Sequence, residues 1–335
     1  MLEPEFQKTS FTDDKIVQSR IAFGYDKDEE EIIVKPMLEN GLEAIGSMGE
    51  DTPLAVMSRK SRLLYTYFKQ IFAQVTNPAI DSLRERQVMS VHMHLRARLG
   101  LFQEFGTDKK IVTSRTTIIV KKDYDELQSM ESFLGKVVEL DATFPIQNGP
   151  EGLEEALRNL AIEAVKQQEV NNARIITITD ENLGADRCPI PMLLAVGAVH
   201  QELVRKGKRM DCDIIAKSGE ARDVHQIACL LGFGANVVYP YFLFELACDM
   251  VEKGVCKEGL TAEDAFNNYR HAIEKGILKI MAKMGISTLF SYHSAQNFEA
   301  VGLSKSVIDD CFPGTASPID GIGYCLLYTS PSPRD

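Results

Sequence analysis

The middle of the chain alternates short runs of β-branched residues with longer segments whose apolar positions recur at the spacing of an amphipathic helix. Runs such as ARIITIT at 173–179 have the continuous apolar character of strands that are buried on both faces. Strand, helix, strand, helix at these lengths predicts an α/β fold with a parallel sheet and right-handed crossovers. The expected strands are 136–141, 173–179, 212–216 and 235–238, and the expected helices are 152–168, 191–205 and 220–231.

The flanking segments carry less regular patterns. Residues 60–75 have apolar side chains at helical spacing, which predicts an amphipathic helix. Asn77-Pro78 would end that helix, because the residue before a proline is pushed away from helical backbone. The other expected elements are helices at 13–23 and 28–37, β-rich chain at 111–120, and a short strand at 286–290 within a mostly helical stretch at 242–300.

Composition fits a globular protein of about two domains, since 44% of the 335 residues are hydrophobic and 25% are charged. The net charge of −11 repels phosphate backbones, so no nucleic-acid partner is expected. No apolar run reaches the ~18 residues of a membrane span, so no membrane contact is expected. The first ten residues are polar and carry no secretory signal. These features predict a location in the cytoplasm or in a plastid stroma.

The cysteines give no sign of a metal or redox site. None of them forms a Cys-x-x-Cys pair, so neither a zinc site nor a thioredoxin-like site is supported. Reduced thiols fit the expected compartment. The seven positions are Cys188, Cys212, Cys229, Cys248, Cys256, Cys311 and Cys325.

The loop after residues 60–75 is the first candidate site, with Thr76, Asn77 and Asp81 as its polar residues. Asn77-Pro78 forces an extended backbone, and the side chains of Thr76 and Asp81 can bond nearby amides. One interpretation is a helix-stop turn in which Asp81 caps the next helix. The other is a rigid polar loop with a functional role, which depends on the resemblance given below.

A turn of small residues late in the chain is the second candidate site. Its serine and threonine could contact a flavin or a substrate. The alternative is packing in a barrel core, because Met281, Met284 and Ile286 are apolar fillers. The polar and small residues of this turn are Lys283, Gly285, Ser287 and Thr288.

The histidines favour structural interpretations. His92 and His94 would share one face of a strand, but a metal site needs a third ligand and none is near in sequence. His200 and His225 lie in apolar helical patterns, where satisfied core histidines are the simpler interpretation.

Three further polar or glycine-rich segments could be read as ligand-binding sites. Two of them have a structural alternative, and the third does not fit the motif it resembles. Asp180 and 218–220 follow expected strands, at the edge where α/β folds bind ligands, and a vestigial or structural role is the alternative. Residues 46–51 are either an anion-binding nest or a structural or interdomain turn. Gly232-Phe233-Gly234 precedes a strand, whereas a dinucleotide fingerprint must follow one.

Four segments carry a resemblance to a known family. They are 46–81 (GSMGEDTPLAVMSRKSRLLYTYFKQIFAQVTNPAID), 190–200 (IPMLLAVGAVH), 218–241 with SGEAR, LGFGAN and YPY, and 279–315 with KIMAKMGIST and FEAVGL. In this order they resemble the large, glutamine-dependent subunit of glutamate synthase, from about Phe23 to Gly323. Ala79, Tyr239 and His293-Ser294 depart from the residues usual in the family, which loosens the assignment to a branch but not to the family.

The resemblance implies a fold in parts. In the family a glutaminase domain precedes a central α/β domain resembling a reduced barrel, and an FMN-binding (β/α)8 barrel with an iron–sulfur cluster follows it. This chain then comprises a linker or remnant of the preceding domain at 1–23, the central domain at 24–260, and the incomplete start of the barrel domain at 261–323. Residues 324–335, with two Ser-Pro pairs and no periodicity, are expected to be a disordered or foreign tail.

The resemblance also implies a reaction, the transfer of the glutamine amide nitrogen to 2-oxoglutarate with electrons from reduced FMN. The chain lacks the nucleophilic cysteine and the cluster-binding segment of the family, so alone it is expected to bind neither FMN nor an iron–sulfur cluster and to be inactive. Its expected partners are its own glutaminase and FMN domains and an electron donor, which is a subunit, a domain or ferredoxin.

The same resemblance gives the two candidate sites their roles. Thr76, Asn77 and Asp81 would line or gate the ammonia passage, and Lys283, Gly285, Ser287 and Thr288 would lie near the synthase site. Two other classes stay open. One is a non-catalytic α/β scaffold module, and the other is an independent small flavin-binding oxidoreductase.

Overall fold

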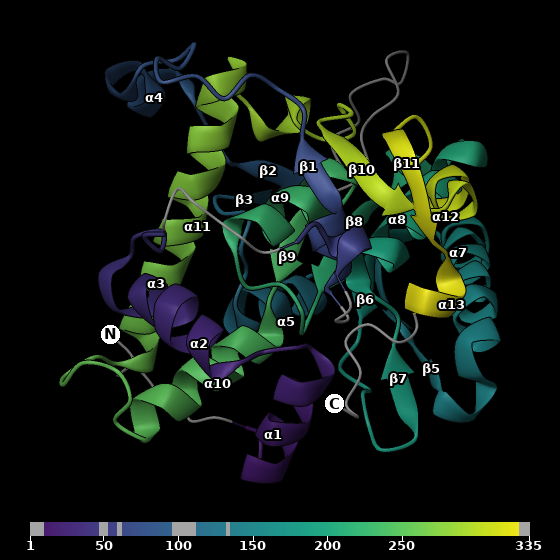
Figure 1. Ribbon diagram of the computed structural model, residues 1–335, viewed down its shortest axis with the longest axis horizontal. Coiled ribbons are helices and arrows are strands. Elements are labelled where there is room, and N and C mark those ends of the chain that lie inside the picture. Colours follow the sequence, from purple (N-terminus) through teal and green to yellow (C-terminus); the bar gives the residue numbers. More distant parts are fainter. Residues whose placement is uncertain (1–9, 47–52, 59–61, 96–111, 132–134, 328–335) are drawn as a thin grey trace.

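A parallel sheet forms the centre of the computed structural model, which describes residues 10–46, 53–58, 62–95, 112–131 and 135–327 (Figure 1). Its four strands lie in the order β4-β6-β8-β9, and each neighbouring pair is parallel. The expected α/β fold with a parallel sheet is therefore confirmed. The strands are β4 (Lys136–Asp141), β6 (Ala173–Thr179), β8 (Asp213–Lys217) and β9 (Val237–Tyr239).

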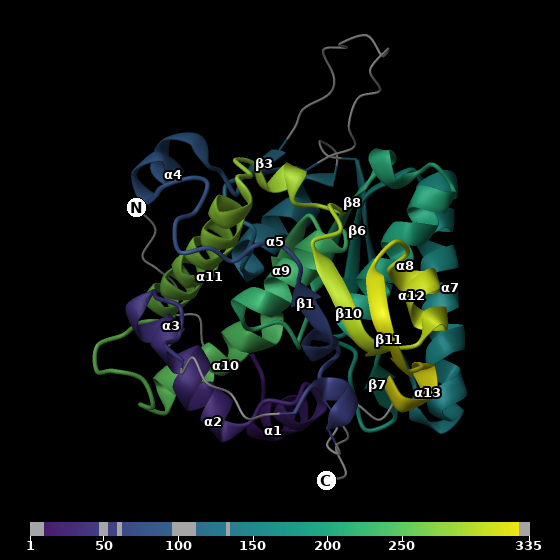
Figure 2. The same ribbon diagram turned by 45° about the horizontal axis from the view of Figure 1, so that its top comes forward.

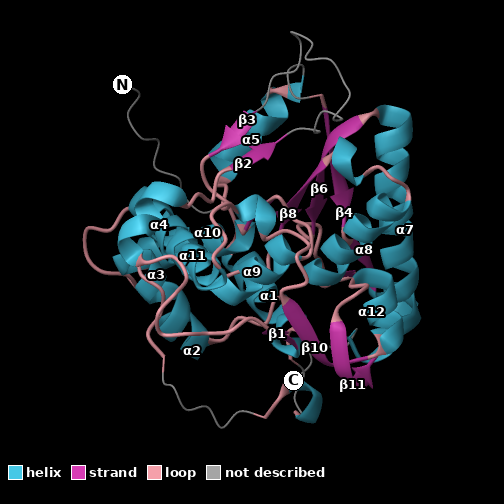
Figure 3. Cartoon of the chain, turned by 90° about the horizontal axis from the view of Figure 1, so that it is seen from above, coloured by secondary structure: helices cyan, strands magenta, loops and turns pink. Residues whose placement is uncertain are grey.

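Long helices connect these strands and cover them. Figure 3 shows α7 and α8 side by side against β4, β6 and β8. α8 is apolar almost all round and nearly fully buried, because it lies between the sheet and the outer helices α7 and α12. The connecting helices are α7 (Gly149–Asn171), α8 (Met192–Arg205) and α9 (Val224–Gly232), and α10 (Tyr241–Glu252) follows β9.

The sheet continues beyond β9 with a segment that comes earlier in the chain. The amide of Ile119 donates to Val238 O at 3.0 Å, and the amide of Val238 donates to Thr117 O at 2.8 Å. Ile118 makes a parallel bridge with Val238 and is fully buried. The β-rich chain expected at 111–120 is confirmed in part. It holds this bridge, and also β3 (Val112–Ser114), which pairs with β2 (Met93–Leu95); α5 (Lys121–Ser129) follows.

A second, smaller sheet lies beside the first. Figure 2 shows β10 between β1 and β11. β10 pairs antiparallel with β1 and parallel with β11. The elements are β1 (Phe68–Gln70), β10 (Phe298–Leu303), α12 (Lys305–Cys311) and β11 (Ala316–Ile322), and the separate pair is β5 (Thr143–Pro145) with β7 (Arg187–Pro189).

The N-terminal helices confirm the two expected at 13–23 and 28–37. They lie along α10 and α11, and Ile16, Phe23 and Leu38 are buried in the same hydrophobic core as the central sheet. The elements are α1 (Asp13–Ala22), α2 (Lys27–Glu29), a π-helical turn (Glu30–Val34), α3 (Lys35–Asn40) and, later in the chain, α11 (Ala262–Met284).

The helix expected at 60–75 is wrong for the part that the structure describes. Leu64–Tyr67 form a 3-10 turn, and Phe68–Gln70 form β1. The Phe68 ring packs against those of Phe233 and Phe312, with centroids 5.0 and 4.9 Å apart. This packing and the pairing with β10 outweigh the helical spacing, which is a weak prior for an aromatic-rich segment. Residues 60 and 61 lie outside the described residues.

The strand expected at 286–290 is also wrong. Thr288 makes only an isolated bridge with Ser90, and Leu289–Ser291 form a 3-10 turn. The strand of this region is β10, whose first three residues fall at the end of the stretch expected to be mostly helical. A short, mostly apolar run such as FEAVGL cannot be told from a helix segment by periodicity alone.

The end of the chain is described as far as Leu327. Tyr324–Leu327 form the short helix α13, which packs against α7 and buries Tyr324 and Leu327. The rest of the segment expected to be a tail, 328–335, lies outside the described residues. Within the part of the chain that the structure describes, none of the helices has the length and hydropathy to span a bilayer.

Candidate functional site

The two candidate segments, chosen separately from the sequence, meet at the C-terminal end of α11. The amide of Ile80 donates to Ala282 O at 3.2 Å, and the amide of Ser90 donates to Ser287 O at 2.8 Å. A Cβ added to Gly285 would lie 3.4 Å from the Ala79 side chain. Residues 76–90 therefore form a strap across the end of α11. The sequence contained no sign that the two segments are neighbours.

The polar residues of the strap lie at the surface. Thr76 and Asn77 are exposed. Asp81 caps α4 (Ser82–Val88), and its carboxylate accepts from the amides of Leu83 and Arg84 at 3.0 Å each. The bond from the Arg84 amide is the first cause of the lowered pKa of Asp81. The predicted capping role of Asp81 is confirmed.

The end of α11 that faces the strap is equally open. Gly285 takes a left-handed conformation with φ of 74°, and its amide returns to Ala282 O, which ends the helix. Ser287 and Thr288 are exposed, and the Thr288 hydroxyl lies 3.4 Å from that of Ser291. Lys283 reaches Gln74 across the junction, with Nζ 3.5 Å from Oε1. The junction thus presents exposed hydroxyl, amide and ammonium groups on a backbone fixed by main-chain hydrogen bonds.

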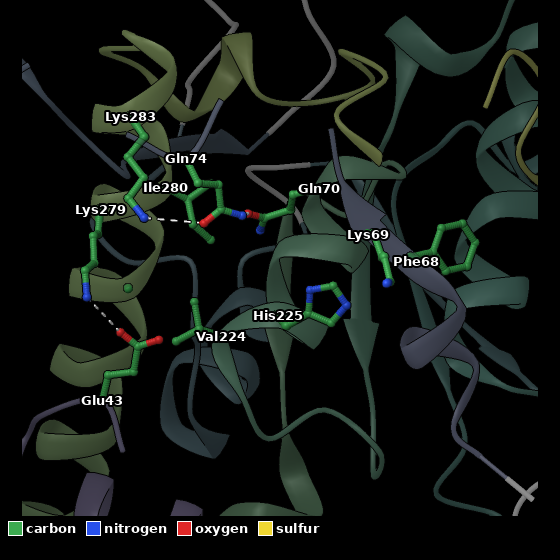
Figure 4. A pocket seen from close by; sticks show the side chains of 11 residues that line it. Glu43, Phe68, Lys69, Gln70, Gln74, Val224, His225, Lys279, Ile280 and Lys283 are labelled. Carbon is green, nitrogen blue, oxygen red and sulfur yellow. Dashed lines mark hydrogen bonds and ion pairs between the residues drawn. The ribbon is translucent and has the colours of Figure 1, made fainter. Parts of the chain in front are cut away.

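A pocket of about 510 Å³ borders this junction (Figure 4). One wall is the extended chain from Phe68 to Gln74, and the other is the last turns of α11 from Gly276 to Lys283. Val224 and His225, at the start of α9, form the floor. Gly276 allows the close approach of α9 and α11, because a Cβ there would lie 2.5 Å from a methyl group of Val224.

The C-terminal edge of the parallel sheet, where a ligand was one interpretation, is filled by side chains. Asp180, which follows β6, is fully buried and accepts from the Gly219 amide at 2.9 Å. Glu220 accepts from the Tyr65 hydroxyl at 3.2 Å and from the Met192 amide at 3.0 Å. These carboxylates join chain segments far apart in sequence, which supports the structural interpretation of 218–220.

Burial changes the acidity of both carboxyl groups. Desolvation is the first cause of the raised pKa of Asp180, and the neighbouring charge of Glu220 raises it further. Desolvation also raises the pKa of Glu220 to about 7, although the bonds from Met192 and Tyr65 act in the opposite direction. The sheet edge therefore carries a carboxyl group that titrates near neutral pH.

A substitution at Gly219 tests how tightly the C-terminal edge of the parallel sheet is packed. A Cβ there would lie 2.1 Å from the ring of Phe23, so Gly219→Ala is expected to lower the free energy of unfolding by about 2 kcal/mol through overpacking. Denaturant unfolding measures this. Gly184→Ala is the matched control, because its Cβ would meet only an ordinary contact at 3.4 Å. Equal stabilities of the two variants would contradict the packing described here.

The histidines occupy structural positions. His200 Nδ1 accepts from Arg209 Nε at 2.9 Å, and Nε2 lies 3.1 Å from the Ser294 hydroxyl. Burial lowers the pKa of His200 to about 3, so the ring stays neutral. His225 Nε2 donates to Tyr65 O at 3.0 Å. His200 and His225 thus have hydrogen-bond partners, as a core role requires.

The remaining candidates do not assemble a reactive centre in the described residues. His92 and His94 are both exposed and alternate with buried neighbours along the chain. All seven cysteines are free thiols. In the parts of the chain described, no three His, Cys, Asp or Glu side chains are placed to hold a metal ion. Gly46 is exposed, but the other residues of the possible nest at 46–51 lie outside the described residues.

Comparison with known proteins identifies relatives over most of the chain. Residues 18–304 match the family model of the glutamate synthase central domain. The chain is 39% identical over 326 residues to glutamate synthase [NADH] of Schizosaccharomyces pombe. It is 40% identical over 303 residues to the large chain of glutamate synthase [NADPH] of Azospirillum brasilense, and 39% identical over 330 residues to ferredoxin-dependent glutamate synthase 2 of Synechocystis.

The relatives are much longer than this chain. The three alignments cover 96%, 90% and 94% of the chain but only 15%, 20% and 21% of the respective relatives. Among solved structures, a flavocytochrome b2 mutant with bound pyruvate aligns with 58% of this chain and 44% of its own, at a TM-score of 0.35 and 14% identity. A likeness of that strength supports no inference about this chain.

Proposed function

Because the chain belongs to the glutamate synthase central domain family, we propose that in a complete glutamate synthase it connects the site that releases ammonia from glutamine with the site that uses it. The complete protein transfers that nitrogen to 2-oxoglutarate, with reduced FMN as the electron source. Its partners are then its own glutaminase and FMN domains and an electron donor, which is a subunit, a domain or ferredoxin. The proposed location is the cytoplasm or a plastid stroma.

One observation carries the role proposed for this part. Residues 76–90 and the end of α11, far apart in sequence, are joined by the main-chain bonds of Ile80 to Ala282 and of Ser90 to Ser287. A passage for a small neutral molecule needs a rigid wall with polar groups along it. The junction offers Thr76 and Asn77 on one side and Ser287 and Thr288 on the other. We assign these residues to the wall of the ammonia passage, with Lys283 beside them.

The sheet order supports a reduced barrel as the finer description of the central fold. β4, β6, β8 and β9 are neighbours in the order of the chain, and residues 117–119, which precede β4, lie beside β9. In a closed ring the first strand likewise lies next to the last, and this neighbourhood is what supports the proposal. In this proposal residues 24–260 form that domain, and residues 261–323 begin the FMN-binding barrel domain.

The residues described here do not themselves fit the cofactors of the complete protein. The sheet edge that would receive a flavin is filled by Phe23, Asp180 and Glu220. No group of metal-binding side chains in the described segments suits an iron–sulfur cluster. We therefore derive no step of the reaction through either group, and we propose that this part is structural and inactive by itself.

Thr76→Val in the complete enzyme tests the proposed passage. The valine keeps the volume but removes the hydroxyl, so part of the ammonia should leak before it reacts. Glutamine hydrolysis is then expected to exceed glutamate formation by about twofold, because the effective concentration at the second site falls. The two rates are measured in the same assay. Thr66→Val, at an exposed position outside the strap, should leave them equal. Equal rates of glutamine hydrolysis and glutamate formation in Thr76→Val would contradict the proposal that Thr76 lines the ammonia passage.

A flavin titration separates the remaining alternatives. If the purified chain retained FMN through gel filtration, it would be an independent flavin-binding oxidoreductase rather than a connecting part. The other outcome is a chain that binds no flavin, together with a Thr76→Val enzyme in which glutamine hydrolysis and glutamate formation stay equal. This chain would then be a scaffold module without an ammonia passage.

A further inference from the structure

The pocket between β1 and α11 has a cationic rim that the proposed function does not use. Lys69, Lys279 and Lys283 line it, and Glu43 supplies the carboxylate among its described lining residues. Glu299 lies opposite Lys69 in the pairing of β1 with β10. Lys279 Nζ lies 3.5 Å from the Glu43 carboxylate, while the partner of the Lys283 ammonium among the described residues is the neutral side-chain amide of Gln74 (Figure 4). In a chain with a net charge of −11, this local excess of positive charge favours an anionic ligand.

The interior of the pocket adds a second reason. The first residues of α9, Val224 and His225, form its floor. Val224 and Ile280 supply apolar surface, and Gln70 and Gln74 supply side-chain amides that can donate to oxygen. An apolar floor with a few convergent polar groups is typical of a small-molecule site.

The size of the pocket narrows the ligand class. About 510 Å³ is in the range of pockets that hold small organic molecules and is larger than an inorganic phosphate needs. The three lysines come from two elements on opposite walls, so they can meet two separate anionic groups. We propose that this pocket binds a small organic dicarboxylate, with one carboxylate toward Lys69 and the other toward Lys279 and Lys283.

Titration of the 335-residue chain with succinate at low ionic strength tests the proposal, because such charge contacts are screened by salt. Isothermal titration calorimetry should show saturable binding, and the ring signals of His225 should shift in NMR spectra. Lys279→Ala is expected to weaken the Kd about tenfold, as the loss of one charge-assisted hydrogen bond predicts. Lys279 is exposed, so the variant should fold, which circular dichroism checks.

Two controls separate a specific site from general attraction. Lys275→Ala removes the same charge one turn earlier on α11, at an exposed position outside the pocket lining, and should leave the Kd within about twofold. Succinamide has the same carbon skeleton without the charges and should bind much more weakly. Inorganic phosphate should also bind more weakly, since it cannot span the walls.

Several results would overturn the proposal. Absence of saturation, equal binding of succinamide, equal binding of phosphate, or equal losses in Lys275→Ala and Lys279→Ala would each do so. The test uses only binding to the chain itself. Its outcome is therefore distinguishable from that of the coupling assay on Thr76, which uses the complete enzyme.

Discussion

At pH 8, the substitution Glu220→Gln is expected to raise the free energy of unfolding by about 2 kcal/mol, so the variant should be more stable than the parent chain. Burial raises the pKa of the Glu220 carboxyl from its ordinary 4.5 to about 7, so holding the charged form in the folded chain costs about 3 kcal/mol. Glutamine is neutral, and its carbonyl can accept from Tyr65 and Met192 as the carboxylate does. A newly buried amide donor without a partner returns roughly 1 kcal/mol of that gain.

The stability of the parent chain is expected to depend on pH through Glu220, whereas that of the glutamine variant does not depend on this group. Between about pH 4.5 and 7 the folded chain holds a proton on Glu220 that the unfolded chain has lost, so the parent loses stability as the pH rises through that window. Below 4.5 both states are protonated and the charge costs nothing. The stability of the variant relative to the parent should therefore fall by about 3 kcal/mol from pH 8 to pH 4, from a gain of about 2 kcal/mol to a loss of about 1 kcal/mol.

Denaturant unfolding of both proteins at several pH values measures the difference. Glu258→Gln, at an exposed position, is the matched control and should run parallel to the parent at every pH. A gap between Glu220→Gln and the parent that stays constant from pH 4 to 8 would show that Glu220 titrates normally in the folded chain.

The central sheet could be predicted from the sequence because its strands are continuous apolar runs. β6 has the expected bounds, 173–179, and β4 has the expected bounds, 136–141. The start of α9 was expected at Glu220 but lies at Val224. The Ser218 hydroxyl accepts from the amides of Glu220 and Ala221, which holds them in a turn, and Asp223 caps the helix instead. Local side-chain bonds of this kind compete with helix formation and shift its boundary.

The candidate site could be predicted only residue by residue. Asp81 follows a proline turn and precedes a helical segment, so its capping role was visible in the sequence. The junction of 76–90 with the end of α11 depends on packing between distant segments, for which one sequence offers no signal. The wrong prediction of a helix at 60–75 also meant that the pocket could not be predicted. One wall of the pocket is the extended chain from Phe68 to Gln74.

Arg222 has a structural role that the sequence pattern did not indicate. Its side chain is 1% exposed, and its guanidinium donates to the backbone carbonyls of Phe23 and Gly24 and to the carboxylate of Glu29. It also lies 4.1 Å from the ring centre of Tyr25. One buried cation thus holds the turn between α1 and α2 against the C-terminal edge of the sheet. In the sequence it is one charged residue in a short polar stretch.

Arg222→Met is expected to lower the free energy of unfolding by about 3 to 5 kcal/mol, because it strands the buried acceptors while keeping the volume. Denaturant unfolding measures the loss, and limited proteolysis should show cleavage near residues 23–29 before cleavage of the central sheet. Adding Glu29→Gln should recover part of the loss, since the stranded carboxylate is then neutral. Arg158→Met, which breaks an exposed pair with Glu154, should cost less than about 1 kcal/mol. A loss in Arg222→Met no larger than that control would mean that the N-terminal segment is held by its apolar contacts alone.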